Sequence, residues 1–186
     1  MSCDDRAPPP YHVVRFDELL PLTKNPADTF LPRYRRERFS VVGRADERRA
    51  GEPGIPIDAA VNFGFIRCAP GTGNCSHKHP NWEIFIPMSG RWRLVLQGGP
   101  LEAPGELFLE AWDLILVPPD TFHEATNVGA AEACMLSLNP GKKGAAYTLH
   151  PHVIEELRAL GPEVEAAARR AVDIAGATRS PAGVSK

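Results

Sequence analysis

The sequence predicts an all-β domain, folded as a small antiparallel sandwich or closed barrel. The 186-residue chain has nineteen prolines and sixteen glycines, and those in its middle divide it into short pieces, as closely spaced strands require. Several pieces alternate apolar and polar side chains, which is the period of a strand with one buried face. Turn signals such as Ser89-Gly90 and residues 97–100 (QGGP) lie between them. Without an internal repeat, these strands indicate one barrel rather than two.

The middle of the chain supplies the strands of this barrel. In residues 91–97, Trp92, Leu94 and Leu96 share one face, and polar side chains interrupt the other. Similar short runs, rich in β-branched and aromatic residues, occur before and after this segment. The predicted strands are residues 61–68, 83–88, 91–97, 112–117, 122–127 and 132–138.

The first 56 residues are less regular. Residues 12–16 and 38–42 are candidate strands, and residues 17–20 are a candidate helical turn. Residues 46–56 are polar and contain glycine and proline, which favours a loop. We therefore assign residues 1–56 to an N-terminal extension with possible edge strands.

The pattern changes after the barrel core, which we assign to residues 57–140. Beyond Pro151, the apolar residues Ile154, Leu157 and Leu160 recur at helical spacing. The pair Gly161-Pro162 interrupts this run, and Val164, Ala168, Ala171, Val172 and Ala175 resume it. Residues 141–175 are thus a C-terminal helical segment, and residues 176–186 are a predicted disordered tail.

Composition bounds the partners and the compartment. The hydrophobic fraction of 43% is ordinary for a globular protein, and the net charge of −2 gives no reason to expect nucleic acid as a partner. No apolar run reaches the roughly 18 residues of a membrane helix, and the N-terminus lacks the apolar core of a secretory signal. The cysteines, at positions 3, 68, 75 and 134, form no C-x-x-C pair. We expect a cytoplasmic protein with free thiols.

Candidate metal ligands lie in two short blocks, residues 71–90 and 112–127. In the first block, His77, His79 and Glu83 are separated by two and four residues. An extended chain would turn all three side chains to one face. In the second block, His123 would add a fourth ligand from a different strand across the interior. Imidazole nitrogen and carboxylate oxygen suit a divalent transition metal, so the blocks predict one such ion per chain.

The two blocks resemble the two motifs of the cupin family of jelly-roll barrels. Gly71, His77, His79, Glu83 and Gly90 match every anchor of the first motif. In the second motif, Pro118, His123 and Asn127 match, whereas Trp112 and Asp120 stand where the family usually has glycine.

The resemblance covers about residues 60–140 and implies a single jelly-roll barrel with a metal on His77, His79, Glu83 and His123. It also implies a homodimer. Aspartate tolerates the left-handed backbone of a tight turn, and we expect Trp112 to affect local packing rather than ligation. A metal-free polar core is disfavoured, because three buried imidazoles and a carboxylate need compensation.

Four ligands on an octahedral ion leave about two positions open for substrate. Within the resemblance, the favoured function is a non-haem iron(II) dioxygenase of a small oxygenated substrate, whether aromatic, diketone or enol. Glu83 would also serve catalytically by taking a proton from the substrate. One alternative is an isomerase or lyase that uses manganese, nickel or zinc without oxygen. A non-catalytic small-molecule-binding protein is the other.

The remaining histidines, cysteines and aromatic residues have structural interpretations. His150 and His152 are expected at a helix start or on the surface, and His12 stands alone. Cys75 is expected to be a buried structural thiol, because no base is placed to activate it. Phe63, Phe65 and Trp92 are candidates to line a ligand cavity. Core positions are expected for most of Trp82, Phe85, Trp92, Trp112 and Phe122.

Overall fold

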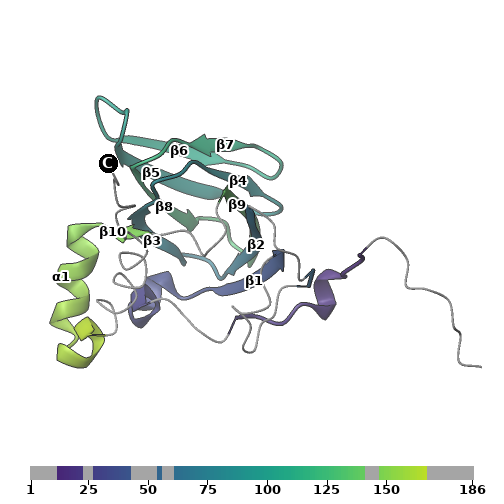
Figure 1. Cartoon of the computed structure of the whole chain (residues 1–186), viewed down its shortest axis with the longest axis horizontal. Coiled ribbons are helices and arrows are strands. Elements are labelled where there is room, and N and C mark those ends of the chain that lie inside the picture. Colours follow the sequence, from purple (N-terminus) through teal and green to yellow (C-terminus); the bar gives the residue numbers. More distant parts are fainter. Residues whose placement is uncertain (1–11, 23–26, 43–53, 56–60, 141–146, 167–186) are drawn as a thin grey trace, which may run out of the picture.

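Two five-stranded antiparallel sheets face each other and enclose the core in the computed structural model (Figure 1). The structure describes residues 12–22, 27–42, 54–55, 61–140 and 147–166. Among these residues, no helix is long and apolar enough to span a membrane. The predicted all-β jelly roll is confirmed.

The chain crosses between the sheets at most of its connections. The first sheet, sheet A, has the order β1 (Glu37–Val42), β2 (Val61–Cys68), β9 (Ala133–Pro140), β4 (Glu83–Pro87) and β7 (Ile115–Val117). The second, sheet B, has the order β10 (Thr148–Leu149), β3 (Gly73–Lys78), β8 (Thr121–Asn127), β5 (Trp92–Gly98) and β6 (Gly105–Leu109). Because most consecutive strands lie in different sheets, many residues close in sequence meet across the interior.

Most predicted strands are present. Residues 61–68 form β2 with the predicted bounds, and β4, β5, β8 and β9 lie within two residues of theirs. The predicted strand 112–117 is shorter, because Trp112 has a left-handed backbone (φ 76°) and turns the chain before Ile115. Strands β3, β6 and β10 were not predicted. The sequence of β3, GNCSHK, lacks the apolar alternation that marks a strand.

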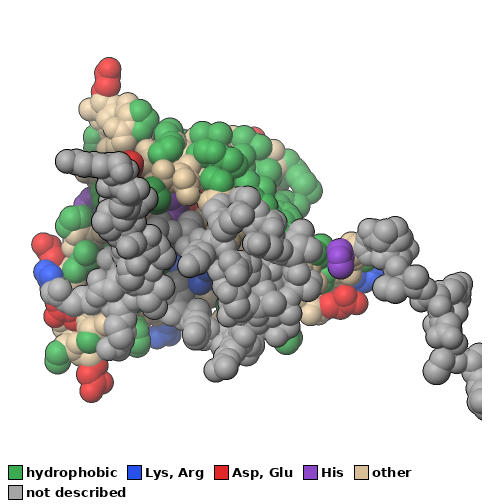
Figure 2. Space-filling view, in the orientation of Figure 1, with side chains coloured by type: hydrophobic (Ala, Val, Ile, Leu, Met, Phe, Trp, Pro, Cys, Tyr) green, Lys and Arg blue, Asp and Glu red, His purple; other side chains and the backbone are tan. Residues whose placement is uncertain are grey.

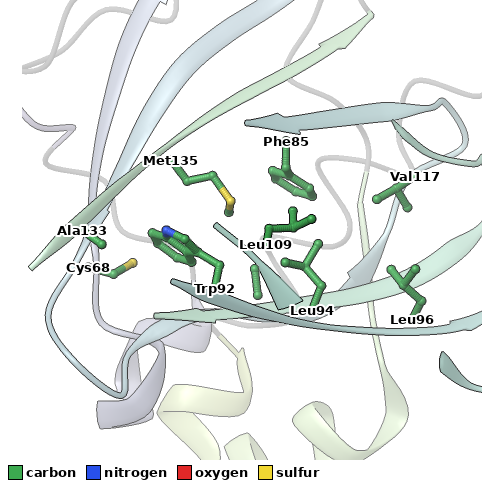
Figure 3. Packing of buried hydrophobic residues seen from close by; sticks show 10 residues of the cluster. Cys68, Phe85, Trp92, Leu94, Leu96, Leu109, Val117, Ala133 and Met135 are labelled. Atoms are coloured by element: carbon green, nitrogen blue, oxygen red, sulfur yellow. The ribbon is translucent and has the colours of Figure 1, made fainter. Parts of the chain in front are cut away.

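The core between the sheets is apolar and contains residues from both (Figure 3). The predicted face of β5 points inward, where Trp92 and Leu94 are fully buried. The Trp92 indole nitrogen donates a hydrogen bond to the Ser89 carbonyl (3.0 Å), so its burial leaves no unpaired donor. Burial of one such side chain contributes about 1.5–3 kcal/mol. The cluster comprises Cys68, Phe85, Trp92, Leu94, Leu96, Leu109, Val117, Ala125, Ala133 and Met135.

Helix α1 (Pro151–Ala159) lies beside β10 and β3, on the outside of sheet B (Figure 1). It begins at Pro151 because His150 caps it: the His150 Nδ1 accepts a hydrogen bond from the His152 backbone N–H (3.4 Å). This confirms the predicted helix start. Residues 162–166 are also helical, and the rest of the second predicted run lies outside the described residues. The helix packs through a buried cluster of Ala27, Leu31, Tyr34, Cys75, Leu149, Val153 and Leu157.

The N-terminal extension combines short 3-10 turns with one edge strand. Strand β1 confirms the candidate strand 38–42. The candidate strand 12–16 is wrong, because residues 12–15 form no strand and a 3-10 turn begins at Phe16. This turn, Phe16–Glu18, confirms the predicted helical turn. Two more 3-10 turns, Ala27–Phe30 and Pro32–Tyr34, precede β1. Some predicted segments lie outside the described residues. They are the tail 176–186, the segment boundaries at 56/57 and 140/141, and the loop 46–56 except for residues 54 and 55.

The outer face of sheet A carries a row of apolar side chains across four strands. Leu116 pairs with Ile84, Ile84 with Leu138, and Leu138 with Phe63. Leu116 of this row is 52% exposed, and nearby Leu114 is 59% exposed. Hydrophobic side chains gather over β4 and β7 in the space-filling view (Figure 2). We call the paired row of Phe63, Leu138, Ile84 and Leu116 the apolar ladder.

Candidate metal centre

His77 and His123 occupy facing positions on two adjacent strands of sheet B. His77 on β3 is the direct register partner of His123 on β8, and their ring centroids are 4.4 Å apart. We expected His123 to reach the site from across the interior, and this is wrong for His77, because the two histidines lie on adjacent strands of the same sheet. Antiparallel pairing of two inward-facing positions places both imidazoles side by side.

His79 and Glu83 come from the crossing between the sheets. Strand β3 ends at Lys78, His79 lies in the connection that follows, and Glu83 is the first residue of β4 in sheet A. The expectation that one extended chain aligns His77, His79 and Glu83 is wrong, because the chain changes sheets between them. The Asp120 backbone N–H donates to the His79 carbonyl (2.7 Å), which ties this connection to the second block.

The structure nevertheless brings all four predicted ligands together. One donor atom from each of His77, His79, Glu83 and His123 lies within 4.8 Å of the others. The Glu83 Oε2 is 3.1 Å from the His123 Nε2 and 3.3 Å from the His79 Nε2. Glu83 is 4% exposed and His123 is 1% exposed, whereas His77 is partly exposed. Two ligands at about 2.1 Å on opposite sides of one ion would be about 4.2 Å apart, so the cluster has the size of a metal site.

Backbone carbonyls fix the orientation of two imidazoles. The His77 Nδ1 lies 2.7 Å from the Cys75 carbonyl oxygen, and the His123 Nδ1 lies 3.0 Å from the Thr121 carbonyl oxygen. Because a carbonyl can only accept, Nδ1 carries the proton in each ring and Nε2 keeps its lone pair. This arrangement directs the basic nitrogens of both histidines toward the cluster, as metal-ligating histidines require.

The Glu83 carboxylate is held by its other oxygen. The Ser137 hydroxyl donates a hydrogen bond to Oε1 (2.6 Å), and the Asn139 amide nitrogen lies 3.4 Å from the same atom. Both residues are on β9, next to β4 in sheet A. Oε2 is thus left facing the histidines.

Two buried atoms in the cluster have no hydrogen-bond partner among the described residues. They are the Glu83 Oε2 and the His123 Nε2, which face each other as two lone-pair sites. An unpaired buried acceptor is costly, and two opposed acceptors are worse. A cation between them would satisfy both, so the residues present fit a divalent metal ion.

Both kinds of ligand favour the protonation state that binds metal. Burial opposes ionisation of Glu83, but the neighbouring His123 and His79 outweigh it and hold the carboxyl pKa well below its usual range. Burial, together with the charges of His123 and His79, lowers the pKa of His77 well below that of a free imidazole. At neutral pH the site therefore offers a carboxylate and neutral imidazole.

Metal content is expected to fall as the pH is lowered from about 7 to about 5, because protons compete for the imidazole nitrogens. The metal-free protein should lose stability in the same direction. The folded state disfavours protonated His77, so the unfolded chain binds more protons below about pH 6.5 and stability rises with pH there. Elemental analysis after dialysis at each pH measures the first effect. Stoichiometric metal well below about pH 5 would show that histidines are not the ligands.

The other motif residues shape the backbone around the site. Asn127 is fully buried, and its amide nitrogen donates to the carbonyls of Cys68 (3.0 Å) and Ala131 (2.8 Å). Trp112 and Asp120, at the two positions where glycine is usual, both have positive φ (76° and 59°). The left-handed turns are thus kept without glycine, at a cost in backbone strain. Trp112 was expected in the core but is 72% exposed.

The remaining predictions have mixed outcomes. Cys75 is buried against the α1 cluster, and burial raises the pKa of its thiol, so it is a structural thiol as predicted. Phe85 and Trp92 are core residues as predicted. Phe63 and Phe65 pack with Leu19, Phe39 and Val41 on the outside of sheet A, so they line no interior cavity.

A hollow of about 350 Å³ lies on the outer face of sheet B and not at the metal ligands. Phe122 and Glu124 line it, and they flank His123 on β8 with the opposite orientation. Its arginines already have acidic partners: Arg33 pairs with Glu156, and Arg93 pairs with Glu106. The hollow is therefore separated from the cluster by the sheet itself.

Several residues near the cluster were not predicted. Ser137 and Asn139 hold Glu83, and the Tyr147 ring lies 5.8 Å from the His77 ring. Ser137 and Asn139 alternate with Leu136 and Leu138, so polar residues on one face of an otherwise apolar strand were the available signal. Tyr147 precedes the two-residue strand β10, for which the sequence offers no comparable signal.

Comparison with known proteins supports the fold. The family model described as the Cupin domain matches residues 64–139. Residues 64–139 form a cupin domain. This segment contains all four clustered ligands, and no curated protein matches the chain in sequence.

Two solved structures share this cupin fold. An oxalate decarboxylase from Lactobacillus farciminis, in a formate complex, is 14% identical with a TM-score of 0.55. The match covers 78% of this chain and 36% of that one, so this chain corresponds to only part of the decarboxylase. An oxalate oxidase bound to the substrate analogue glycolate is 18% identical with a TM-score of 0.50, covering 77% of this chain and 73% of that one. At these identities the likeness concerns the fold alone.

Proposed function

We propose that this cupin is a metal-dependent enzyme, a non-haem iron(II) dioxygenase that acts on a small oxygenated substrate, whether aromatic, diketone or enol. The observation that supports the proposal is the buried three-histidine, one-glutamate cluster with two opposed, unpaired acceptor atoms. This ligand set leaves about two positions open on an octahedral ion, enough for a substrate oxygen and a second ligand.

The residues of the cluster have distinct roles in this proposal. His77, His79 and His123 hold the ion through neutral imidazoles. Glu83 holds it through Oε2, while the Ser137 hydroxyl keeps Oε1 in place at 2.6 Å. As the buried carboxylate of the site, Glu83 also takes the proton of an acidic substrate hydroxyl or enol. Iron(II), when bound, supplies the capacity to activate dioxygen.

Oxygen uptake after anaerobic reconstitution with iron(II) tests the proposal. We expect oxygen consumption with at least one member of a panel of diketones, phenols and enols. His123→Ala should abolish the uptake, and His152→Ala, which changes an exposed histidine at the start of α1, should retain it. No uptake across the panel, together with zinc or nickel in the protein as purified, would contradict a dioxygenase. Turnover without oxygen would instead favour an isomerase or lyase using manganese, nickel or zinc.

The homodimer stays a prediction, and the apolar ladder on sheet A indicates where to test it. Exposed apolar patches of this kind mark association sites in soluble proteins. A two-fold dimer needs only one surface that is complementary to itself, and a flat apolar row meets that requirement.

We expect Leu116→Lys to shift the protein from dimer to monomer in size-exclusion chromatography with light scattering, because it places a charge at the most exposed end of the apolar ladder. Leu116 is 52% exposed, so the monomer should fold normally. Leu160→Lys is the matched control, since Leu160 is 50% exposed at the end of α1. A wild-type monomer, or a dimer unaffected by Leu116→Lys, would contradict this interface.

A further inference from the structure

Arg38 is an arginine on the inward face of edge strand β1. Its neighbours Phe39 and Val41 pack in the buried cluster outside sheet A, so the alternation of the strand turns Arg38 the other way. Arg38 pairs in register with Ile66, which packs against the core between the sheets. The next inward position pairs Ser40 with Gly64, and Gly64 in turn pairs with Ser137. Arg38 therefore faces the same interior as Glu83, which Ser137 holds.

The nearby acidic groups already have other partners. Asp28 pairs with Arg36 (2.7 Å), and Glu37 pairs with Arg67 (2.6 Å). Glu83 faces His79 and His123. Within the described parts of the chain, the Arg38 guanidinium makes no hydrogen bond or ion pair.

The electrostatic surroundings of Arg38 contain acidic groups, Asp28 and Glu83, that face other partners among the described residues. Burial, followed by the positive charge of Arg36, lowers the pKa of Arg38, although Asp28, Tyr147 and Glu83 oppose the change. An arginine stays protonated even so, so among the described residues Arg38 is a partly buried cation without a hydrogen-bonded anion. An anion that enters the interior would compensate it.

Tyr147 lies beside two of the metal ligands. Its ring lies 5.8 Å from the His77 ring and 6.4 Å from the His79 ring, and it interacts electrostatically with Arg38. Its phenol carries an O–H group that can donate a hydrogen bond. Arg38 and Tyr147 thus offer hydrogen-bond donors, Arg38 from the inward face of β1 and Tyr147 beside His77.

We propose that Arg38 binds a carboxylate group of the substrate, with the Tyr147 hydroxyl as a second donor, so that the substrate is a small organic acid. This inference rests on the proposed function, since it names the substrate class of the same site. The planar guanidinium presents parallel N–H groups that match the two oxygens of a carboxylate. A second oxygen of the same acid would then be directed toward His77, His79 and Glu83.

Calorimetric titration of the zinc-loaded protein tests this inference without any redox chemistry. The probes are two matched pairs, benzoate with benzamide and glycolate with glycolamide. In the wild type, each carboxylate should bind more tightly than its neutral amide. Arg38→Met should weaken carboxylate binding about 10- to 100-fold, the effect of losing a charge-assisted hydrogen-bond pair, and leave amide binding unchanged.

Three further variants separate recognition from folding. Arg93→Met removes an arginine paired with Glu106 on the outer face of sheet B and should change nothing. Arg38→Lys keeps the charge but loses the planar geometry, so it should recover only part of the affinity. Tyr147→Phe should weaken carboxylate binding less than Arg38→Met does. One zinc ion per chain in every variant, by elemental analysis, shows that the metal site is intact.

The inference is overturned if Arg38→Met binds carboxylates as tightly as the wild type, or if wild type does not prefer carboxylates to amides. Tighter binding of inorganic phosphate than of either carboxylate would also overturn it. The wild-type preference remains a readout even if Arg38→Met fails to fold. Carboxylate binding that depends on Arg38, without oxygen uptake, would refute the dioxygenase and keep this inference. Oxygen uptake with neutral diketones, without a preference for carboxylates in binding, would support the dioxygenase and overturn this inference.

Discussion

His123→Ala is expected to reduce the metal content from one ion per chain to nearly none after dialysis. His123 is 1% exposed, and its Nε2 faces the Glu83 Oε2 at 3.1 Å, so its removal takes away a buried ligand at the centre of the cluster. Loss of a residue that only orients a ligand costs about 10- to 100-fold in metal affinity, and loss of a ligand itself should exceed that range. Elemental analysis and competition with a chromophoric chelator measure the loss.

Two further variants serve as a control and as an intermediate case for the loss of metal in His123→Ala. His152→Ala removes an exposed histidine outside the cluster and should keep full metal content. Ser137→Ala removes the 2.6 Å hydrogen bond to Glu83 and should weaken binding by about 10-fold, an intermediate effect. Metal retained at one ion per chain in His123→Ala would mean that the ion lies elsewhere.

Arg36→Met is expected to lower the free energy of unfolding by about 3–5 kcal/mol. Arg36 and Asp28 form a buried ion pair at 2.7 Å, with side chains 8% and 1% exposed. The same Arg36 nitrogen also donates to the carbonyl of Tyr34 (2.7 Å). Without Arg36, the Asp28 carboxylate stays buried without a cationic partner among the described residues, and the Cys75 backbone N–H lies 3.4 Å from its Oδ2. Urea denaturation of the protein at neutral pH measures the change.

The control for this stability experiment is Arg93→Met. Arg93 pairs with Glu106 on the surface, with side chains 39% and 45% exposed, and such pairs contribute about 1 kcal/mol or less. Adding Asp28→Leu to Arg36→Met should recover part of the stability, because the unpaired buried charge is removed. A loss below about 1 kcal/mol for Arg36→Met would show that the pair does not anchor the N-terminal extension.

Prediction from the sequence succeeded where one residue type alternates with another along a single strand. Strand β2 was predicted with its correct bounds, and the inward face of β5 was predicted from Trp92 and Leu94. The four metal ligands were named because their spacing matched two motifs, and the structure brings them within 4.8 Å. Backbone conformation at Asp120 was also anticipated, since aspartate tolerates the positive φ found there.

Prediction failed where the outcome depends on which strands pair. Strand β3 is polar, yet its first four residues are buried and Cys75 packs in the cluster that includes α1, which no local pattern records. The register that places His77 beside His123 follows from the order of strands in the sheet. Arg38 and Ser40 alternate with Phe39 and Val41 in the sequence, yet only the pairing of β1 with β2 shows that Arg38 faces the barrel interior. Trp112 was misplaced because its backbone turns the chain before β7.

The division of the ligands between the sheets has a consequence for how the protein unfolds. His77 and His123 belong to sheet B, whereas Glu83 belongs to sheet A. A bound ion is therefore a crosslink between the two halves of the barrel, which cannot separate at this end until at least one ligand is released. Metal loading should slow hydrogen exchange in β3, β8 and β4 together, and thermal inactivation should be governed by the rate of metal loss. The same ion that would bind substrate would also set the lifetime of the folded barrel.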